Sequence, residues 1–184
     1  VPLTLPYGDI HLSPHERAIN PITGRYWVML SGGKTDFTIK VWNSASFQAV
    51  VCQLRDRGIQ VVQLGDNQRT HWHPTIQGTL DLRGKTSLRN MLQIIQHADG
   101  VICGVTAAMH MAAAMQRLCV VIAGGREAWW WEAYVKENAG LGGLHIAQKL
   151  KIPHRFLHTI GLLDCCKDFG CWRKKQGRCD PKKD

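Results

Sequence analysis

A helix start that could hold a phosphate group lies between two short apolar segments in the middle of the chain. Residues 100–104 are predicted to form a buried strand, residues 106–117 a helix rich in Ala and Met, and residues 119–123 the next strand of a parallel pair. Thr106 stands at the expected N-cap of this helix. Its hydroxyl and the free N–H of Ala107 would face the carboxyl end of the first strand, where the helix dipole favours an anion. The pattern predicts a nucleotide-type ligand.

Other residues with suitable chemistry follow an earlier strand. Gly32 and Gly33 would let the backbone approach a phosphate closely, and Lys34 and Lys40 offer ammonium groups to its charge, although both could be plain surface lysines. His110, one turn into the Ala/Met helix, is either a ligand group or a packing histidine. The spacing fits neither the phosphate-loop motif nor GxGxxG, which argues against an ordinary ATPase or a nicotinamide-binding enzyme.

The elements that must position these groups alternate between strand and helix. They are predicted as a strand at 26–31, a helix capped by Asn43 or Ser44 and ending near 57, strands at 59–64 and 80–82, a helix at 87–97 capped by Thr86, the strand–helix–strand unit described above, and a last strand at 155–160. This order predicts an α/β fold with a doubly wound parallel sheet, Rossmann-like, that binds ligands where loops leave the carboxyl ends of the strands.

The composition is that of a globular protein with one domain. The chain has 184 residues, 45% of them hydrophobic and 20% charged. We expect an extended lead-in or linker at 1–25, an α/β domain at 26–163 that binds the nucleotide-type ligand, and a Cys-rich basic tail at 164–184. No apolar run approaches the ~18 residues of a membrane helix and no signal peptide is recognisable, so we expect a cytoplasmic protein. The first residue, Val1, hints at a fragment or a processed product.

Much of the net charge of +9 lies in the tail. The basic residues there are Lys167, Arg173, Lys174, Lys175, Arg178, Lys182 and Lys183. Only Trp172 could provide an aromatic platform among them, so we expect a solvated basic end and no nucleic-acid partner. A basic chain also suits anionic substrates and peripheral contact with acidic membranes.

The cysteines fall into two groups. Cys52, Cys103 and Cys119 occur singly in apolar segments and are expected to be buried and reduced. The second group, which lies within the tail, consists of Cys165, Cys166, Cys171 and Cys179. These four thiols could surround a structural zinc or iron, but their spacing lacks CxxC pairs, so disulfides or free thiols stay open.

A segment rich in His and Trp follows the second predicted strand. His71, Trp72 and His73 suggest a metal site, but no third ligand accompanies them in what is predicted to be a loop. Stacking on a nucleobase, or a place in an interface, is an equally good interpretation.

Several short motifs occur in a fixed order along this pattern. They are Lys40-Val41-Trp42 after the glycine loop, Gly65 after the second strand, LRGKTSL at 82–88, and Ala98-Asp99 through Thr106 and His110. Together they resemble the carboxyl-terminal, donor-binding half of the heptosyltransferases, family-nine glycosyltransferases with two facing Rossmann-like domains (GT-B). The resemblance runs from about residue 26 to 160.

The resemblance implies roles for individual residues. A lysine matching Lys40 and the helix start matching Thr106 and Ala107 bind the diphosphate of the nucleotide sugar in that family. Polar residues after the glycine matching Gly65 reach the ribose, which implies Asp66 and Asn67. Positions matching Met109 and His110 complete the helix motif, and Gly125, Arg126 and Glu127 look like part of a sub-branch that also carries the Cys-Cys and Gly-Cys-Trp tail.

The resemblance also implies a reaction. The chain would be the nucleotide-sugar-binding domain of an inverting glycosyltransferase that transfers a sugar to an acceptor hydroxyl, with no cofactor for the chemistry. The family's acidic residue before the helix is replaced at Val105-Thr106, which leaves the sugar open. No general base or acceptor-binding half is recognisable, so we expect a partner domain and no activity from this chain alone. The alternatives are a non-catalytic nucleotide or sugar-phosphate binding and assembly module, or a domain resembling a sugar-nucleotide epimerase.

Overall fold

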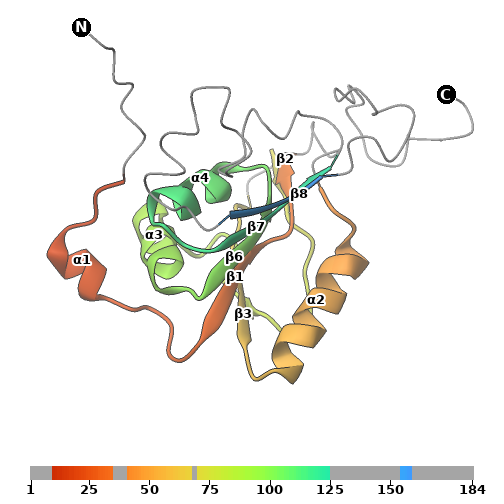
Figure 1. The fold of residues 1–184 in the computed structure, drawn as a ribbon, viewed down its shortest axis with the longest axis horizontal. Helices are drawn as coiled ribbons and strands as arrows, with labels where there is room; N and C mark the ends of the chain where they lie inside the picture. The colour runs from red at the N-terminus through yellow and green to blue at the C-terminus, as the bar shows by residue number, and fades with distance from the viewer. Residues whose placement is uncertain (1–9, 35–40, 68–69, 125–153, 159–184) are drawn as a thin grey trace, which may run out of the picture.

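A computed structural model of the chain describes residues 10–34, 41–67, 70–124 and 154–158. Within these residues, parallel strands form one main sheet with helices on both faces (Figure 1). The strands are β1 (Tyr26–Leu30), β3 (Gln60–Gln63), β5 (Leu80–Asp81), β6 (Gly100–Gly104), β7 (Cys119–Gly124) and β8 (His154–His158). The helices are α1 (Pro14–Ala18), α2 (Ser44–Asp56), α3 (Leu88–His97) and α4 (Ala107–Ala114). The predicted doubly wound α/β fold is confirmed.

The order of the strands identifies the edge where a ligand can bind. The main sheet runs β5-β3-β1-β6-β7-β8, and every pair in it is parallel. The chain moves outward in one direction from β1 through β3 and β5, and then returns to β6 on the other side of β1. This is the strand order of dinucleotide-binding folds, whose ligands lie beyond the carboxyl ends of the strands at the point of reversal. Here that point lies between Leu30 of β1 and its neighbour Cys103 of β6.

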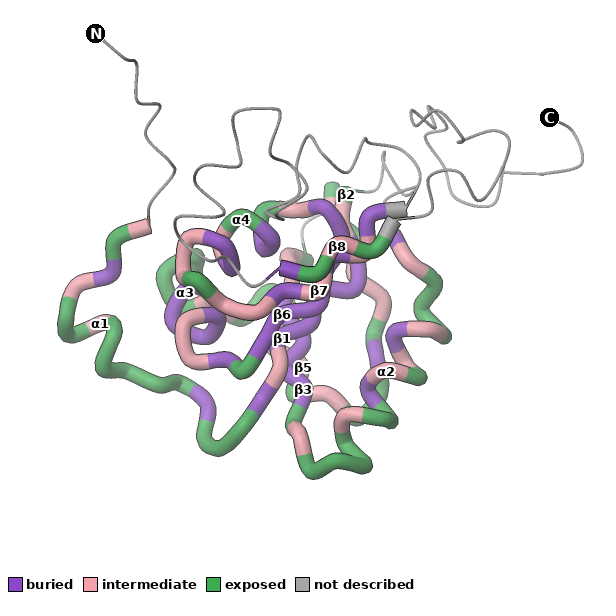
Figure 2. The backbone as a smooth tube through the Cα atoms, viewed as in Figure 1, coloured by how far each residue is buried: buried purple, intermediate pink, exposed green. Residues whose placement is uncertain are grey.

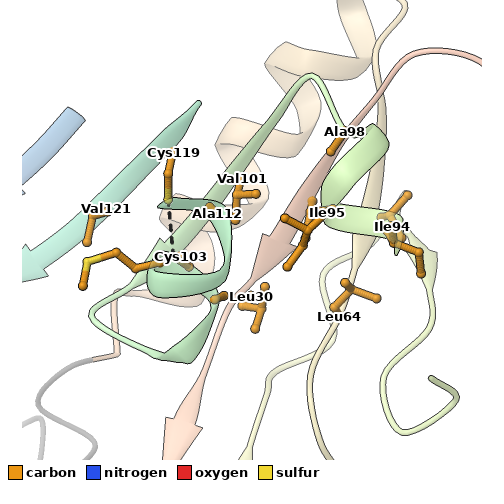
Figure 3. Packing of buried hydrophobic residues seen from close by; sticks show 14 of the residues in the cluster. Leu30, Leu64, Ile94, Ile95, Ala98, Val101, Cys103, Ala112, Cys119 and Val121 are labelled. Atoms are coloured by element: carbon orange, nitrogen blue, oxygen red, sulfur yellow. Dashed lines mark hydrogen bonds between the residues drawn. The ribbon is translucent and has the colours of Figure 1, made fainter. Parts of the chain in front are cut away.

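The side chains of the strands alternate between two apolar layers. Val28 and Leu30 belong to a cluster beneath α3 and α4, whereas Met29 packs with Phe47 and Val51 of α2 on the opposite face. Figure 2 shows the buried residues concentrated in the central strands, and Figure 3 shows the first cluster from close by. Both faces of the sheet are therefore covered, as a parallel sheet requires.

The helices begin close to the predicted positions. The Asn43 side chain accepts a hydrogen bond from the N–H of Ala45 at 2.7 Å and so caps α2. Ser87, one residue after the predicted Thr86, caps α3 through the N–H of Asn90 at 3.1 Å. These bonds satisfy donors that helical geometry leaves free.

Two of the expected cysteine environments are confirmed and one is wrong. Cys103 and Cys119 are buried on neighbouring strands, with their sulfur atoms 3.7 Å apart (Figure 3). Hydrogen bonding to Cys103 and burial raise the pKa of the Cys119 thiol, so it stays protonated. Cys52, predicted to be buried, is exposed on α2, because the apolar stripe of that helix passes through Phe47 and Val51 instead.

The expectation of an extended segment at 1–25 is wrong for part of its length. Residues Pro14–Ala18 form α1, and Leu12 and Ile22 on either side of it are buried. The Ser13 hydroxyl accepts from the N–H of Glu16, and the Glu16 carboxylate accepts from the N–H of Ser13. This reciprocal capping follows from the Ser-x-x-Glu spacing, which signals a helix start despite the nearby prolines.

Polar contacts fasten α1 to α3. Arg89 donates from Nε to the Glu16 carboxylate at 2.7 Å and from Nη1 to the His11 carbonyl at 3.0 Å. Gln93 donates to the carbonyl of Glu16 at 3.2 Å. The hydrogen bonds from Arg89 and Ser13 lower the pKa of Glu16 to about 2. Residues 10–25 are therefore part of the folded domain.

This contact predicts an acid-sensitive contribution to stability. A carboxylate whose pKa is lowered in the folded state stabilises the fold above its unfolded pKa, near 4.5, and stops doing so as the pH falls through about 2. We expect Glu16→Gln to lower the urea midpoint at neutral pH, and the difference from the wild type to vanish between those two pH values. Asp56→Asn, which removes an exposed carboxylate from the end of α2, is the matched control. An equal loss in the control would contradict the interpretation.

Candidate functional site

A small antiparallel ribbon lies at the carboxyl edge of the main sheet. It pairs β2 (Gly33–Lys34), just beyond the end of β1, with β4 (His71–Trp72), in the segment after β3 (Figure 1). Gly33 lies opposite Trp72, and Lys34 lies opposite His71. The sequence predicts a loop at 71–73, whereas residues 71 and 72 form a short strand. The ribbon brings candidates from two loops into contact.

Gly32 allows the backbone of β4 to approach closely. A Cβ atom at Gly32 would lie 1.8 Å from the carbonyl oxygen of Trp72, so any larger residue would push β4 away. The close approach that we predicted toward a phosphate is therefore, at Gly32, an approach to protein backbone. Gly33 differs, because no described atom lies within 4 Å of the position that its Cβ would take.

The segment after β3 has an unusual backbone conformation at Gly65, next to the predicted ribose-binding residues. Gly65 has a φ of +154°, and a Cβ there would lie 2.6 Å from the ring of His73. Asp66 Oδ2 lies 3.7 Å from Nδ1 of His71, which is half-buried like Asp66. Burial, aided by the nearby charges of His71 and Arg83, lowers the pKa of His73, so this ring is neutral at physiological pH.

Gln63, at the end of β3, holds the next part of this segment. Its fully buried amide donates to the Ser31 hydroxyl at 2.8 Å and to the Pro74 carbonyl at 2.6 Å. Its oxygen accepts from the N–H of Ile76 at 3.1 Å and from the Thr79 hydroxyl at 3.4 Å. Gln63 is not among the site residues that the sequence motifs predict. A polar residue at an inward-facing position of a buried strand was the available signal.

Arg83 supports the same segment from the end of β5. Its guanidinium pairs with both carboxylate oxygens of Asp81, at 2.8 and 2.7 Å. It also donates to the His73 carbonyl at 2.5 Å and to the Thr75 hydroxyl at 2.8 Å. The bonds from Arg83 lower the pKa of Asp81 to about 2, so the pair stays charged at physiological pH. Arg83 therefore positions the segment that carries the ribbon.

Asn67 lies against the residues that follow β5. The N–H of Gly84 donates to the Gly65 carbonyl at 2.8 Å, and Gly84 has a φ of +66°. A Cβ at Gly84 would lie 2.4 Å from the side-chain amide of Asn67. Two of the short motifs singled out in the sequence, around Gly65 and within residues 82–88, therefore meet at this edge.

Thr106 is the N-cap of α4, as predicted, but it does not cap as the other helix starts do. Its side chain makes no hydrogen bond to α4. Its Oγ1 is buried and has no hydrogen-bond partner among the described residues. A buried hydroxyl without a partner is costly, which makes this atom a candidate to bond a ligand. Ala107, the next residue, is exposed.

The remaining candidates on α4 have different environments. Met109 is fully buried in the core beneath α4, so its side chain packs against protein. His110 is exposed and lies close enough to His154 of β8 to affect it. Burial and the nearby His110 lower the pKa of His154 to about 4.

Several predicted residues lie outside the described part of the chain. They are Lys40, Gly125, Arg126, Glu127, Cys165, Cys166, Cys171 and Cys179. Among the described residues, no cluster of His, Cys, Asp or Glu side chains could hold a metal ion. None of the helices described is long and apolar enough to cross a membrane.

The sequence model of glycosyltransferase family 9 (heptosyltransferase) matches residues 4–156. The match covers β1 to β7, the ribbon, α4 and the first residues of β8. The chain belongs to this family. No curated protein matches the chain.

Several solved structures have a similar fold. Escherichia coli ADP-heptose LPS heptosyltransferase II is 19% identical with a TM-score of 0.61, covering 85% of this chain and 47% of that chain. A family 9 glycosyltransferase from Veillonella parvula DSM 2008 is 13% identical with a TM-score of 0.59, covering 83% and 43%. The dodecameric iron-containing heptosyltransferase TibC, in complex with ADP-D-beta-D-heptose, is 21% identical with a TM-score of 0.51, covering 61% and 30%. The chain thus spans less than half the length of these relatives.

The environment of Gln63 predicts a stability change that an exposed glutamine does not share. We expect Gln63→Leu to lower the free energy of unfolding by about 1–3 kcal/mol, because the buried N–H of Ile76 loses its acceptor. Gln60→Leu, at the exposed start of the same strand, should change it by less than about 0.5 kcal/mol. Urea unfolding of both variants measures the difference. Equal effects would mean that the Gln63 hydrogen bonds contribute nothing.

Proposed function

We propose that this chain is the donor-binding domain of a family 9 glycosyltransferase and that it binds the diphosphate of a nucleoside diphosphate sugar at the start of α4. The observation that carries the proposal is the buried Thr106 hydroxyl without a described partner, beside the point where the strand order reverses. The first N–H groups of α4 add a site for negative charge. Family membership and the fold support this assignment.

Basic side chains would complete the diphosphate site. Lys34 lies exposed on β2, at the same edge of the sheet as Thr106. Lys40 follows β2 in the chain and is assigned a phosphate contact by its resemblance to the family's lysine. An ammonium group forms a charge-assisted hydrogen bond with a phosphate oxygen and offsets its charge. The two lysines would also stabilise the diphosphate as a leaving group.

The ribose would bind beside the next strand. Asp66 and Asn67 follow the end of β3 after two intervening residues, in the region where dinucleotide-binding folds place the acidic residue that holds ribose hydroxyls. Gly84 leaves room for the Asn67 side chain. His71, 3.7 Å from Asp66, is near enough to orient that carboxylate. The diphosphate and the ribose would thus follow the carboxyl edge from α4 toward β3.

The reaction we propose is an inverting sugar transfer. An acceptor hydroxyl attacks the anomeric carbon, a new carbon–oxygen bond forms, and the bond to the diphosphate breaks as the nucleoside diphosphate leaves. A base must take the proton of the acceptor hydroxyl. None of the described residues at this edge is assigned that role, and we assign the base and the acceptor site to a second domain or partner chain. This chain alone would therefore bind donor without transferring sugar.

Relatives suggest which donor to test first. The TibC structure holds ADP-D-beta-D-heptose, and the E. coli enzyme is named for ADP-heptose. We propose an ADP-sugar as the donor class.

The tail supports a second, structural proposal. Cys165, Cys166, Cys171 and Cys179 offer four thiols near several Lys and Arg residues, whose charge favours thiolates. Four thiolates suit zinc or iron, and TibC is described as iron-containing. Such a metal would hold the tail and take no part in sugar transfer.

Calorimetric titration with ADP, UDP and GDP sugars tests the donor site. We expect binding at millimolar concentration or better. Lys40→Ala should weaken it by about 1–3 kcal/mol through a lost charge-assisted contact. Thr106→Val should weaken it by about 0.5–1.5 kcal/mol without lowering stability, because the hydroxyl makes no bond to α4.

Arg57→Ala, at the opposite end of the sheet, is the control for charge alone and should leave affinity unchanged. A folded wild type that binds none of these sugars would rule out the donor site. Unchanged affinity in both site variants would remove Lys40 and Thr106 from it.

Elemental analysis tests the tail. We expect about one zinc or iron per chain in protein purified without a metal-affinity tag. Replacing Cys171 and Cys179 by Ser should abolish the metal and leave donor affinity unchanged. Metal-free protein with four titratable tail thiols would mean free thiols, and metal-free protein without them would mean disulfides.

A further inference from the structure

Trp72 differs from the other tryptophans that the structure describes. Trp42 packs edge-on against Phe47, with ring centroids 5.1 Å apart. Trp27 packs over Gly100, where a Cβ would lie 2.7 Å from its ring. Trp72 is 49% exposed and is the one aromatic residue among the large exposed hydrophobic side chains of the described residues. Its ring is thus not used to fill the core.

The backbone that carries Trp72 is nevertheless firmly held. The Trp72 carbonyl lies against Gly32, where there is no room for a side chain. Its strand pairs with β2, and the next residue, His73, is fixed through its carbonyl by Arg83. An exposed aromatic ring on a fixed backbone loses little conformational entropy when a ligand binds. This favours a binding role over incidental exposure.

No side chain of the described residues occupies the position beside Trp72. In an antiparallel pair, residues directly opposite each other project to the same face, and the residue opposite Trp72 is Gly33. Gly33 has no side chain, and no described atom lies within 4 Å of where one would begin. A flat group could therefore lie over Gly33 against the indole.

The charges near this position match a nucleotide. Lys34 follows Gly33 directly, and His71, opposite Lys34, lies 3.7 Å from the Asp66 carboxylate. A nucleotide combines an aromatic base with ribose hydroxyls and an anionic diphosphate. Successive residues of a strand point to opposite faces, so Lys34 and His71 lie on the other face of the ribbon from the Trp72 ring. The indole offers a surface for the base, and a nucleotide would have to pass the edge of the ribbon to bring its charged part to Lys34.

We propose that Trp72 is the platform on which the base of the donor nucleotide stacks, and that it favours a purine over a pyrimidine because a purine covers more of the indole. This inference rests on the proposed donor-binding function. It adds a specificity-determining residue on the ribbon, which neither the family match nor the motifs assign.

The test measures the affinities of the full chain for ADP, UDP and inorganic pyrophosphate by calorimetry. Stacking of one base changes affinity by about 5- to 150-fold. We expect Trp72→Ala to weaken ADP binding by a factor in that range, to narrow the ratio of ADP to UDP affinity, and to leave pyrophosphate binding unchanged. Trp72→Phe, which can still stack, should retain most of the ADP affinity.

Leu157→Ala removes another exposed apolar side chain, from β8, and should change none of these affinities. Circular dichroism checks that each variant is folded. ADP binding that Trp72→Ala leaves unchanged would overturn the inference and leave the donor site intact, and would favour an interface role for the indole. Equal losses for ADP and pyrophosphate would also overturn it, because the residue would then act on the phosphate site. A wild type that binds neither ligand would overturn the donor site itself.

Discussion

The shape of the carboxyl edge depends on the hydrogen bonds of one buried amide, that of Gln63. The chain must return from β4 to β5 over the end of the sheet, and its backbone groups there lose contact with water. Gln63 supplies partners for the Pro74 carbonyl and the Ile76 N–H, and it reaches the Ser31 hydroxyl at the end of β1. Gln63 holds residues 74 and 76 of this segment, and Arg83 bonds the carbonyl of His73 just before them. These bonds give the ribbon a defined position. An aliphatic residue would suit the strand equally well but would leave the edge without this support.

The strand order places the start of α4 at that edge. The chain continues from β1 to α2 on one face of the sheet and from β6 to α4 on the other face, so the segments that follow these two neighbouring strands separate beside the start of α4. The side chains of Asn43 and Ser87 form N-cap hydrogen bonds with their own helices, whereas the side chain of Thr106 does not. The same kind of residue thus bonds to its own helix at two positions and makes no such bond at the third. The difference lies in the surroundings of each cap.

Local sequence signals were sufficient for most of the main sheet. Apolar runs and capping residues predicted the strands and helices to within a few residues, and their alternation predicted the parallel topology. The ribbon could not be predicted in this way, because strands of two residues have no periodicity and their pairing joins segments far apart in the chain. The same reason explains Gly32, whose close neighbour, Trp72, lies 40 positions later in the chain. By contrast, α1 was missed although its Ser-x-x-Glu signal was present, because the prolines around it were given more weight.

The candidate site was predictable to the level of loops but not of individual contacts. Topology requires that the segments after β1, β3 and β6 share one edge, so Gly33, Asp66 and Thr106 were placed there from sequence alone. Whether a polar side chain is already hydrogen-bonded to another part of the protein depends on contacts between residues far apart in the chain. Gln63 and Arg83 have protein partners for their polar atoms, and they act by holding the edge in place. The Thr106 hydroxyl is buried and has no hydrogen-bond partner among the described residues. The Trp72 ring is about half exposed. That division separates residues that build the edge from residues that can recognise a ligand, and it makes the two groups separable by mutation.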